Sequence, residues 1–221
     1  MVTTKPLTTL YLQLCLISCC LLFSAITLAQ NSATSPESVT PNSPEENVRL
    51  AEEAFDKSDI IRAMSYYRKA AEAGHGPAMS RLAYLLDKSE ENEEAIEWLK
   101  KAVEIGDPEA QFELARMYAY GEGIKQDKKA AFELFTQSAE QKYAPAIRVL
   151  ALAYENGDLG LRIDYELTQQ WLNHGLLIND YWSIKRLSQA YYTGDLGLRI
   201  NRQKATQLEQ LLEPHKQKNN L

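Results

Sequence analysis

The sequence predicts an all-α solenoid, a superhelix of tandem antiparallel helix pairs. Three observations predict this fold. The segment Gly-Asp-Leu-Gly-Leu-Arg-Ile occurs at residues 157–163 and again at 194–200, an offset of 37 residues. Small and large residues recur along the preceding chain with similar periods, at spacings that fall on helix faces. Glycines and helix-capping residue types separate these stretches. Fixed periods of 20 to 50 residues are typical of solenoids and other repeat arrays.

The first 29 residues have the composition of an export signal. Their one charge is Lys5, an apolar run follows from Leu10 to Phe23, and small residues precede a predicted cleavage after Ala29. Two alternatives stay open. Residues 16–19 resemble a bacterial lipoprotein box in which Cys19 would be lipidated, and the apolar run is long enough to serve as an uncleaved anchor. Each alternative predicts that residues 30–221 lie outside the cytoplasm, in the periplasm or the medium.

Composition limits the function of the remaining chain. The 221 residues include 30 acidic and 24 basic side chains, a net charge of −6, which disfavours binding to nucleic acids or anionic membranes. All three cysteines lie within the first 20 residues, so residues 30–221 contain no disulfide, thiolate nucleophile or cysteine-ligated metal. Residues 30–44 are rich in Ser, Thr and Pro and predict a disordered spacer. We expect the solenoid at 45–216 and a short tail at 217–221.

One register position anchors the predicted repeat. Small or polar residues occupy it in five successive units: Ala63, Ala95, Ala131, Thr168 and Ala205. Large side chains follow three and four residues later, and a second set of small or apolar positions lies 15, 19 and 23 residues after each of the first four anchors. These are helical spacings, so each unit predicts two amphipathic helices.

Capping residues delimit these helices. A first helix is expected at roughly 46–57, with Leu50, Ala51 and Ala54 facing inward. N-cap types precede each anchor, at Asp59, Asn92, Asp127, Asp164 and Asn201. Helix stops fall eleven residues after the anchors, at Gly74, Gly106, Lys142 and Asn179. The C-terminal cap is expected to expose Glu209, Glu213, Lys216 and Lys218.

The residues of one unit carry a family resemblance. They are Ala95-x-x-Trp98-Leu99-x-Lys101-Ala102, Gly106, Ala110, Leu114, Tyr118, Gly121-x-Gly123-Ile124 and Asp127. This pattern resembles the Sel-one-like repeat, a branch of the tetratricopeptide class with a lengthened loop, and the resemblance covers about residues 46–213. It implies about four repeats plus a C-terminal cap helix. The first unit departs from the pattern, because it is 32 residues long and lacks the glycine loop.

No arrangement of residues predicts catalysis. His75, His174 and His215 occupy different repeat phases, and no two of them have metal-ligand spacing. Nucleophile elbows, phosphate loops and dinucleotide fingerprints do not occur in the sequence. We therefore expect a protein that is not an enzyme and that has no cofactor or bound metal. The Gly157 and Gly194 runs are expected to be turns, with anion binding by their backbone amides as the alternative.

Polar and aromatic residues interrupt the apolar pattern of the second helix in each unit. Those with the chemistry of binding hot spots are Tyr84, Phe112, Arg116, Arg148, Lys185 and Arg186. The family resemblance implies that this set of helices lines the concave face of the superhelix. We hypothesise that these six residues bind an extended peptide or a terminal carboxylate; the alternative is that they form solvated helix faces.

The function predicted is a non-enzymatic interaction scaffold in the bacterial cell envelope, with a protein or peptide partner. The resemblance implies such an adaptor role for exported members of the family. Two alternatives stay open: a secreted factor that engages host proteins, and a cell-wall-directed hydrolase. Contact with the membrane is expected only through the N-terminal segment, if it is lipidated or uncleaved.

Overall fold

The computed structural model describes residues 42–213, and every regular element in that range is helical. The α-helices in chain order are α2 (Pro44–Asp56), α3 (Ile60–Glu72), α4 (Gly76–Lys88), α5 (Asn92–Glu104), α6 (Pro108–Tyr120), α7 (Lys128–Glu140), α8 (Ala144–Asn156), α9 (Tyr165–Leu177), α10 (Tyr181–Thr193) and α11 (Arg202–Gln210), with a short 3-10 turn, η2 (Asp158–Gly160). The predicted export signal, residues 30–41 of the predicted spacer, His215, Lys216 and Lys218 lie outside the described residues.

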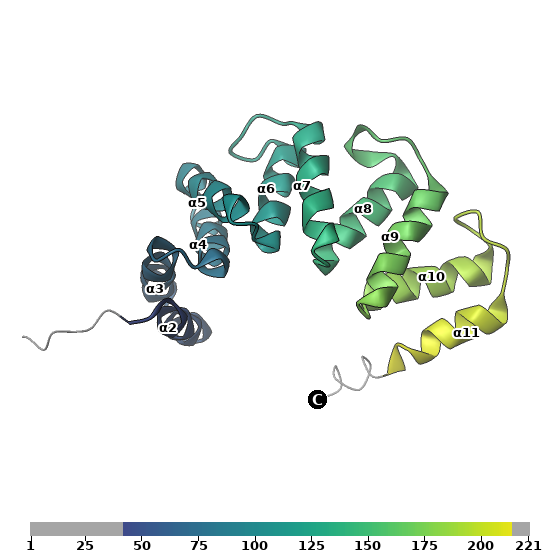
Figure 1. Ribbon diagram of the computed structural model, residues 1–221, viewed down its shortest axis with the longest axis horizontal. Helices are drawn as coiled ribbons and strands as arrows, with labels where there is room; N and C mark the ends of the chain where they lie inside the picture. Colours follow the sequence, from purple (N-terminus) through teal and green to yellow (C-terminus); the bar gives the residue numbers. More distant parts are fainter. Residues whose placement is uncertain (1–41, 214–221) are drawn as a thin grey trace, which may run out of the picture. The chain divides into compact units, whose positions relative to one another are not determined.

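Consecutive helices pack as hairpins, and the hairpins stack in chain order (Figure 1). The closest packing is within the pairs α2/α3, α4/α5, α6/α7, α8/α9 and α10/α11, and each pair also contacts the next. Because each helix mainly contacts its neighbours in sequence, the core runs the length of the array instead of forming one centre. This arrangement confirms the predicted all-α solenoid.

Small residues lie where neighbouring helices approach most closely. All five predicted anchors are completely buried, as are the small residues fifteen positions after them: Ala78, Ala110, Ala146 and Ser183. Gly175 shows how close the approach is, because a Cβ atom added there would lie 2.0 Å from the Ser183 hydroxyl oxygen. Large side chains such as Leu82, Leu114 and Leu150 fill the space between pairs and are also buried.

Side-chain caps begin most of the helices. As predicted, Asp59, Asp127, Asp164 and Asn201 accept hydrogen bonds from backbone N–H groups of the following first turn. The prediction for Asn92 is wrong. Asn92 is the first residue of α5, and Glu91 occupies the N-cap position without a side-chain cap. The reason is the register of the repeat: the cap lies four residues before the anchor in every unit, and Asn92 lies only three before Ala95.

Two kinds of connection join the helices. The turns between pairs are three residues long and contain a left-handed residue at Gly74, Gly106, Lys142 or Asn179, the four predicted stops. Turns of the same length also join α2 to α3 and α4 to α5, so the first unit lacks the longer loop, as predicted. The three later pairs are joined by loops at 121–127, 157–164 and 194–201.

The three long loops share one hydrogen-bonding scheme. In each, the backbone N–H of the next helix cap donates to the carbonyl of a tyrosine in the preceding helix: Asp127 to Tyr118 (2.9 Å), Asp164 to Tyr154 (2.9 Å) and Asn201 to Tyr191 (2.8 Å). Leu159 and Leu196 adopt left-handed φ values of 55° and 52°, a conformation that costs a residue with a side chain about 1–2 kcal/mol. Both leucines pack against core residues, which offsets that cost.

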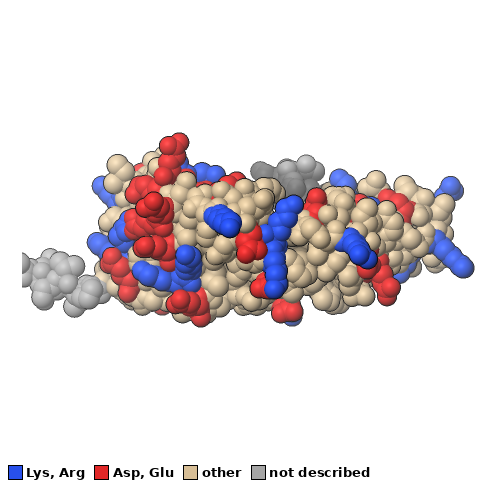
Figure 2. All heavy atoms as spheres, turned by 90° about the horizontal axis from the view of Figure 1, so that it is seen from above, with Lys and Arg blue, Asp and Glu red and all other residues tan. Residues whose placement is uncertain are grey.

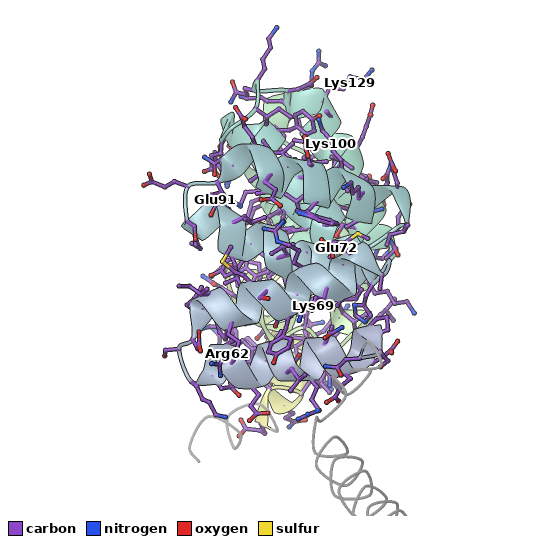
Figure 3. All side chains as sticks on the ribbon, turned by 90° about the vertical axis from the view of Figure 1, so that its left-hand side faces the viewer. Arg62, Lys69, Glu72, Glu91, Lys100 and Lys129 are labelled. Atoms are coloured by element: carbon purple, nitrogen blue, oxygen red, sulfur yellow. The ribbon has the colours of Figure 1, made fainter. Side chains whose placement is uncertain are left out.

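The helices divide the surface into two faces. We call the surface of α4, α6, α8 and α10 the even-helix face, and that of α3, α5, α7 and α9 the odd-helix face. Figure 3 shows part of the odd-helix face, where Lys69, Lys100 and Lys129 mark α3, α5 and α7. Within residues 42–213, no helix combines the length and apolarity needed to cross a membrane.

Candidate functional site

All six residues predicted to bind a partner belong to helices of the even-helix face. Tyr84 lies on α4, Phe112 and Arg116 on α6, Arg148 on α8, and Lys185 and Arg186 on α10. Sequence periodicity predicts this shared face but does not show which side chains are available to a ligand. That question depends on the contacts each of them makes within the chain.

Ion pairs join α4 to α6. Arg116 pairs with Asp87 of α4 at 3.4 Å, with Glu113 of its own helix at 3.0 Å, and with Glu122 of the following loop. Burial lowers the pKa of Arg116, but the hydrogen bond to Glu113 and the neighbouring carboxylates raise it further, so the net shift is upward. The guanidinium is therefore charged and already paired with three carboxylates.

A second contact between these helices pairs Arg81 with Glu109 at 3.6 Å. Burial raises the pKa of the Glu109 carboxyl, and the charge of Arg81 opposes that rise.

Ion pairs also join α8 to α10. Arg148 donates to Oδ1 of Asp180 from Nε at 3.0 Å and from Nη2 at 2.6 Å. Arg186 pairs with Glu155 of α8 at 2.7 Å and with Asp195 at 3.2 Å, and its side chain is only 15% exposed. Both arginines therefore hold neighbouring helix pairs together, and neither presents a free guanidinium.

The junction between α6 and α8 is different, because it holds a groove of about 470 Å³. Among the described residues, no ion pair joins these two helices. The lining is largely apolar and comes from both helices, α7 and the 157–164 loop: Phe112, Ala119, Tyr120, Phe135, Val149, Leu152, Ala153 and Leu159, with Arg116, Gln126, Lys128 and Asp158 among the polar residues. The Phe112 ring packs against Phe135 and Tyr143 at centroid distances of 5.5 and 5.6 Å, which fixes the floor of the groove.

Two further openings lie on either side of this groove along the array. One, of about 330 Å³, lies between α2 and α4 and includes Tyr84, whose ring is covered by Lys88. The other, of about 490 Å³, lies between α10 and α11 and includes Lys185, placed over Tyr181. Grooves thus alternate with the ion-paired junctions α4/α6 and α8/α10.

The structure therefore brings together only two of the six predicted residues, Phe112 and Arg116. Tyr84 and Lys185 lie in separate openings, and Arg148 and Arg186 line none of the three. The prediction missed Tyr120 and Leu159. Tyr120 is 71% exposed at the end of α6. The signal available in the sequence was an aromatic residue directly before the glycine loop.

The histidines in the described range have structural contacts. His75 caps α4, where its Nδ1 accepts a hydrogen bond from the Ala78 backbone N–H at 3.2 Å. His174 packs edge-on against Trp171. Between residues 42 and 213, no three His, Cys, Asp or Glu side chains are grouped so that they could hold a metal ion.

Comparisons with known proteins identify the repeat. The family model for the Sel1 repeat matches residues 55–75, 76–107, 108–143, 144–173 and 183–208. A Sel1 repeat protein from Oxalobacter formigenes is 25% identical with a TM-score of 0.68, over 77% of this chain and 70% of that one. A protective antigen of uropathogenic Escherichia coli is 29% identical with a TM-score of 0.65, over 76% of this chain and 38% of that one.

A curated relative in Arabidopsis thaliana is named as the HRD3A component of an ERAD-associated E3 ubiquitin-protein ligase. It is 29% identical over 144 residues, 58% of this chain, and the chain spans only 21% of the length of that relative. The five matched repeats fall on the helices described above and cover more than half of the sequence. The chain belongs to the Sel1-repeat family.

Proposed function

We propose that this chain is a non-enzymatic interaction scaffold that binds an extended segment of a protein partner on its even-helix face. Sel1-repeat proteins are generally adaptors in protein–protein interactions, and the relative HRD3A is named as a component of a larger complex. The observation that carries the proposal here is the apolar groove between α6 and α8. Its volume of about 470 Å³ lies within the range of ligand pockets, roughly 300–1,000 Å³.

The groove favours apolar side chains of the partner over a terminal carboxylate. Arg116, the guanidinium at its edge, already has three carboxylate neighbours. A ligand carboxylate would have to displace one of them at the cost of an ion pair. Tyr120 and Leu152, which are 71% and 38% exposed, offer apolar surface without that cost.

Photo-crosslinking in cells tests this binding site. A benzoylphenylalanine at Tyr120 preserves the aromatic character of the groove, and one at Lys100 on the odd-helix face is the matched control (Figure 3). We expect one dominant crosslinked protein from Tyr120 and none from Lys100. Equal products from both positions, or none from Tyr120, would contradict the proposed groove.

We also propose that the chain works in the bacterial cell envelope. The support is the composition of residues 1–29, which has the charge, apolar run and small residues of an export signal. The alternatives of lipidation at Cys19, an uncleaved anchor and a secreted factor engaging host proteins predict different mature forms. Intact-mass spectrometry of protein from the native host separates cleavage after Ala29, which leaves Gln30 as the first residue, from lipidation and from an uncleaved anchor. Recovery from the culture medium instead of the envelope fraction would identify a secreted factor. A mature chain that retains residues 1–29 in the cytoplasmic fraction would refute export.

A further inference from the structure

The fold accounts for most residues of the repeated seven-residue segment. Gly157 and Gly194 end α8 and α10 in the left-handed conformation. Leu159 and Leu196 pack against the core, and Gly160 and Gly197 are left-handed. Ile163 and Ile200 lie against Gly157 and Gly194, where an added Cβ would meet their Cγ1 atoms at 3.4 and 3.0 Å. Three identities remain. Asp195 pairs with Arg186, and Leu198 packs against the core. The third is the arginine, at positions 162 and 199.

Arg162 and Arg199 differ from most arginines of this protein. Seven of the ten arginines form ion pairs with carboxylates of the chain: Arg49, Arg62, Arg68, Arg81, Arg116, Arg148 and Arg186. In the part of the chain that the structure describes, Arg162, Arg199 and Arg202 form none, and all three are exposed. An identical, exposed and unpaired arginine in two successive loops has no role in holding the repeats together.

These arginines and Lys125 lie in loops that also carry five carboxylates. Asp127 and Asp164 cap helices, Glu122 and Asp195 pair with Arg116 and Arg186, and Asp158 accepts a hydrogen bond from Asn156. The loops at 121–127, 157–164 and 194–201 join the helices of a pair at the same ends; the first two lie at the top of Figure 1 and the third at its right-hand side. Lys125, Arg162 and Arg199 occupy the same place in each, two residues before the cap of the next helix. We call these three loops the loop edge.

Further cations on this edge oppose local helix stability. Lys128 lies in the first turn of α7, and Arg202 lies in the first turn of α11. Lys204, in the same turn as Arg202, instead donates a hydrogen bond to the Tyr191 hydroxyl at 2.6 Å and lies over the Tyr191 ring. A cation at a helix N-terminus is unfavourable by about 0.3–1 kcal/mol, because the helix dipole is positive there. Departures from local rules are expected at functional sites. Exposed apolar side chains accompany the cations, since Ile163 is 58% and Ile200 63% exposed.

We propose that the loop edge binds an acidic, extended segment of a protein partner. Carboxylates of that segment would pair with Lys125, Arg162 and Arg199, and its apolar side chains would cover Ile163 and Ile200. This surface adjoins the groove on the even-helix face, because Gln126, Asp158 and Leu159 of these loops line that groove, but Lys125, Arg162 and Arg199 do not. Unpaired arginines favour such a partner, because a planar guanidinium binds a carboxylate through two parallel hydrogen bonds.

The acidic end of the same edge favours a linear partner over an anionic membrane. The short turn between α4 and α5 places the exposed Glu90, Glu91 and Glu93 on this side of the molecule. Figure 2 views the molecule from above and shows acidic side chains gathered toward the N-terminal end, with basic and acidic ones both spaced along the rest. A flat anionic surface would meet these glutamates, whereas a linear segment can end at the loop of residues 121–127.

A fluorescent peptide tests the proposal on the full chain. The probe is fluorescein-labelled Gly-Ser-Asp-Leu-Glu-Val-Asp-Leu-Gly-Ser-amide, and its control replaces each acidic residue by the matching amide. Fluorescence anisotropy is expected to show binding of the acidic probe that weakens at high salt, and at least about tenfold weaker binding by the double variant Arg162→Glu/Arg199→Glu. The matched variant Lys100→Glu/Lys142→Glu carries the same change in net charge elsewhere and should bind within about twofold of the unaltered chain.

Three results would overturn the proposal: no binding of the acidic probe, equal binding of the amide control, or equal losses in the two double variants. Sedimentation with phosphatidylglycerol vesicles tests the alternative that the loop edge binds a membrane. Vesicle binding that depends on Arg162 and Arg199, without binding of the peptide, would refute a protein partner in favour of a membrane. Thermal melts are expected to be unchanged in both variants, because all four side chains are exposed and form no ion pair among the described residues.

Discussion

Arg148 of α8 and Asp180, the N-cap residue of α10, form one of the two ion pairs described between these helices. Asp180 receives two hydrogen bonds from the guanidinium on Oδ1, at 3.0 and 2.6 Å, while its Oδ2 accepts from the backbone N–H and the hydroxyl of Ser183. The Asp180 side chain is 2% exposed, so its charge depends on these partners. One carboxylate therefore caps a helix and also links two repeats.

Removal of the Arg148 side chain should destabilise the solenoid. Arg148→Ala leaves a buried carboxylate without its counter-charge, and loss of one partner of a buried pair costs about 3–5 kcal/mol. The Arg148 side chain is 42% exposed, so water can replace part of the interaction. We therefore expect the free energy of unfolding, measured with urea, to fall by about 2 kcal/mol. Lys129→Ala is the control. The Lys129 side chain, which pairs with Glu133, is 88% exposed, so this ion pair should contribute under about 0.5 kcal/mol to the free energy of unfolding. Equal effects of the two substitutions would contradict the assigned role of Arg148.

A charge placed in the central core should unfold the middle of the array. Leu114 is 3% exposed and packs between repeats, so Leu114→Asp buries a carboxylate without a partner. We expect the free energy of unfolding to fall by more than about 4 kcal/mol, as followed by circular dichroism during thermal unfolding. The comparison is Leu152→Asp on the neighbouring even helix, where 38% exposure lets the charge reach water. A melt of the Leu114 variant like that of the unaltered chain would show that the helix register is wrong.

The close contact between α9 and α10 should tolerate no added methyl group. In Gly175→Ala the new Cβ would lie 2.0 Å from the Ser183 hydroxyl oxygen and 2.5 Å from its Cβ. Rotation of the hydroxyl relieves the first contact but not the second, so the helices must separate, at a cost of about 1–3 kcal/mol. The double variant Gly175→Ala/Ser183→Gly removes the clash and should recover part of the loss. If the single variant unfolds at the same urea concentration as the unaltered chain, the approach is looser than described.

Stability should depend on pH through Glu94. Hydrogen bonds from Arg68 and from the Trp98 indole hold the pKa of the Glu94 carboxyl below its ordinary value of 4.5. Because the folded-state pKa is below the unfolded one, the interaction stabilises the fold above pH 4.5, and this contribution disappears as the pH falls through the folded-state pKa.

Urea unfolding of Glu94→Gln measures this contribution. At pH 7 we expect the substitution to lower the free energy of unfolding by up to about 1 kcal/mol. The effect is small because the Glu94 side chain is 34% exposed. The difference from the unaltered chain should narrow between pH 5 and pH 3. A difference that stays constant over this range would assign the effect to packing instead of charge. Glu93→Gln is the control, because no ion pair of the Glu93 carboxylate is described.

The sequence determines the helices and their faces because its periodicity is local. Anchor residues such as Ala63 and Ala131 lie at helical spacings from the large residues that follow, and the structure buries them as expected. Caps and stops are equally local, since Asp127 or Gly106 acts on the turn beside it. Asn92 shows the limit of such reasoning, because a residue of a capping type can lie one position inside the helix, where Glu91 takes the cap position without a side-chain hydrogen bond.

The binding residues were only partly predictable, because availability depends on partners distant in sequence. Arg116 and Arg186 have the chemistry of binding hot spots, but carboxylates 29 and 31 residues earlier in the chain already hold them. Periodicity predicts the helix face on which a side chain lies. It does not predict the distance from that side chain to the next repeat. The opening between α6 and α8 depends in the same way on the spacing of helices that are not neighbours in sequence.

The sequence by itself determined the fold class, the family and the order of the helix pairs, since all three depend on spacings within about forty residues. The tertiary structure alone decided which cations are neutralised and which are free. It neutralises Arg116, Arg148 and Arg186 and leaves Arg162 and Arg199 exposed. The physical reason is that an ion pair forms only where packing brings the two charged groups within a few ångströms, and that distance is set by the stacking of whole repeats.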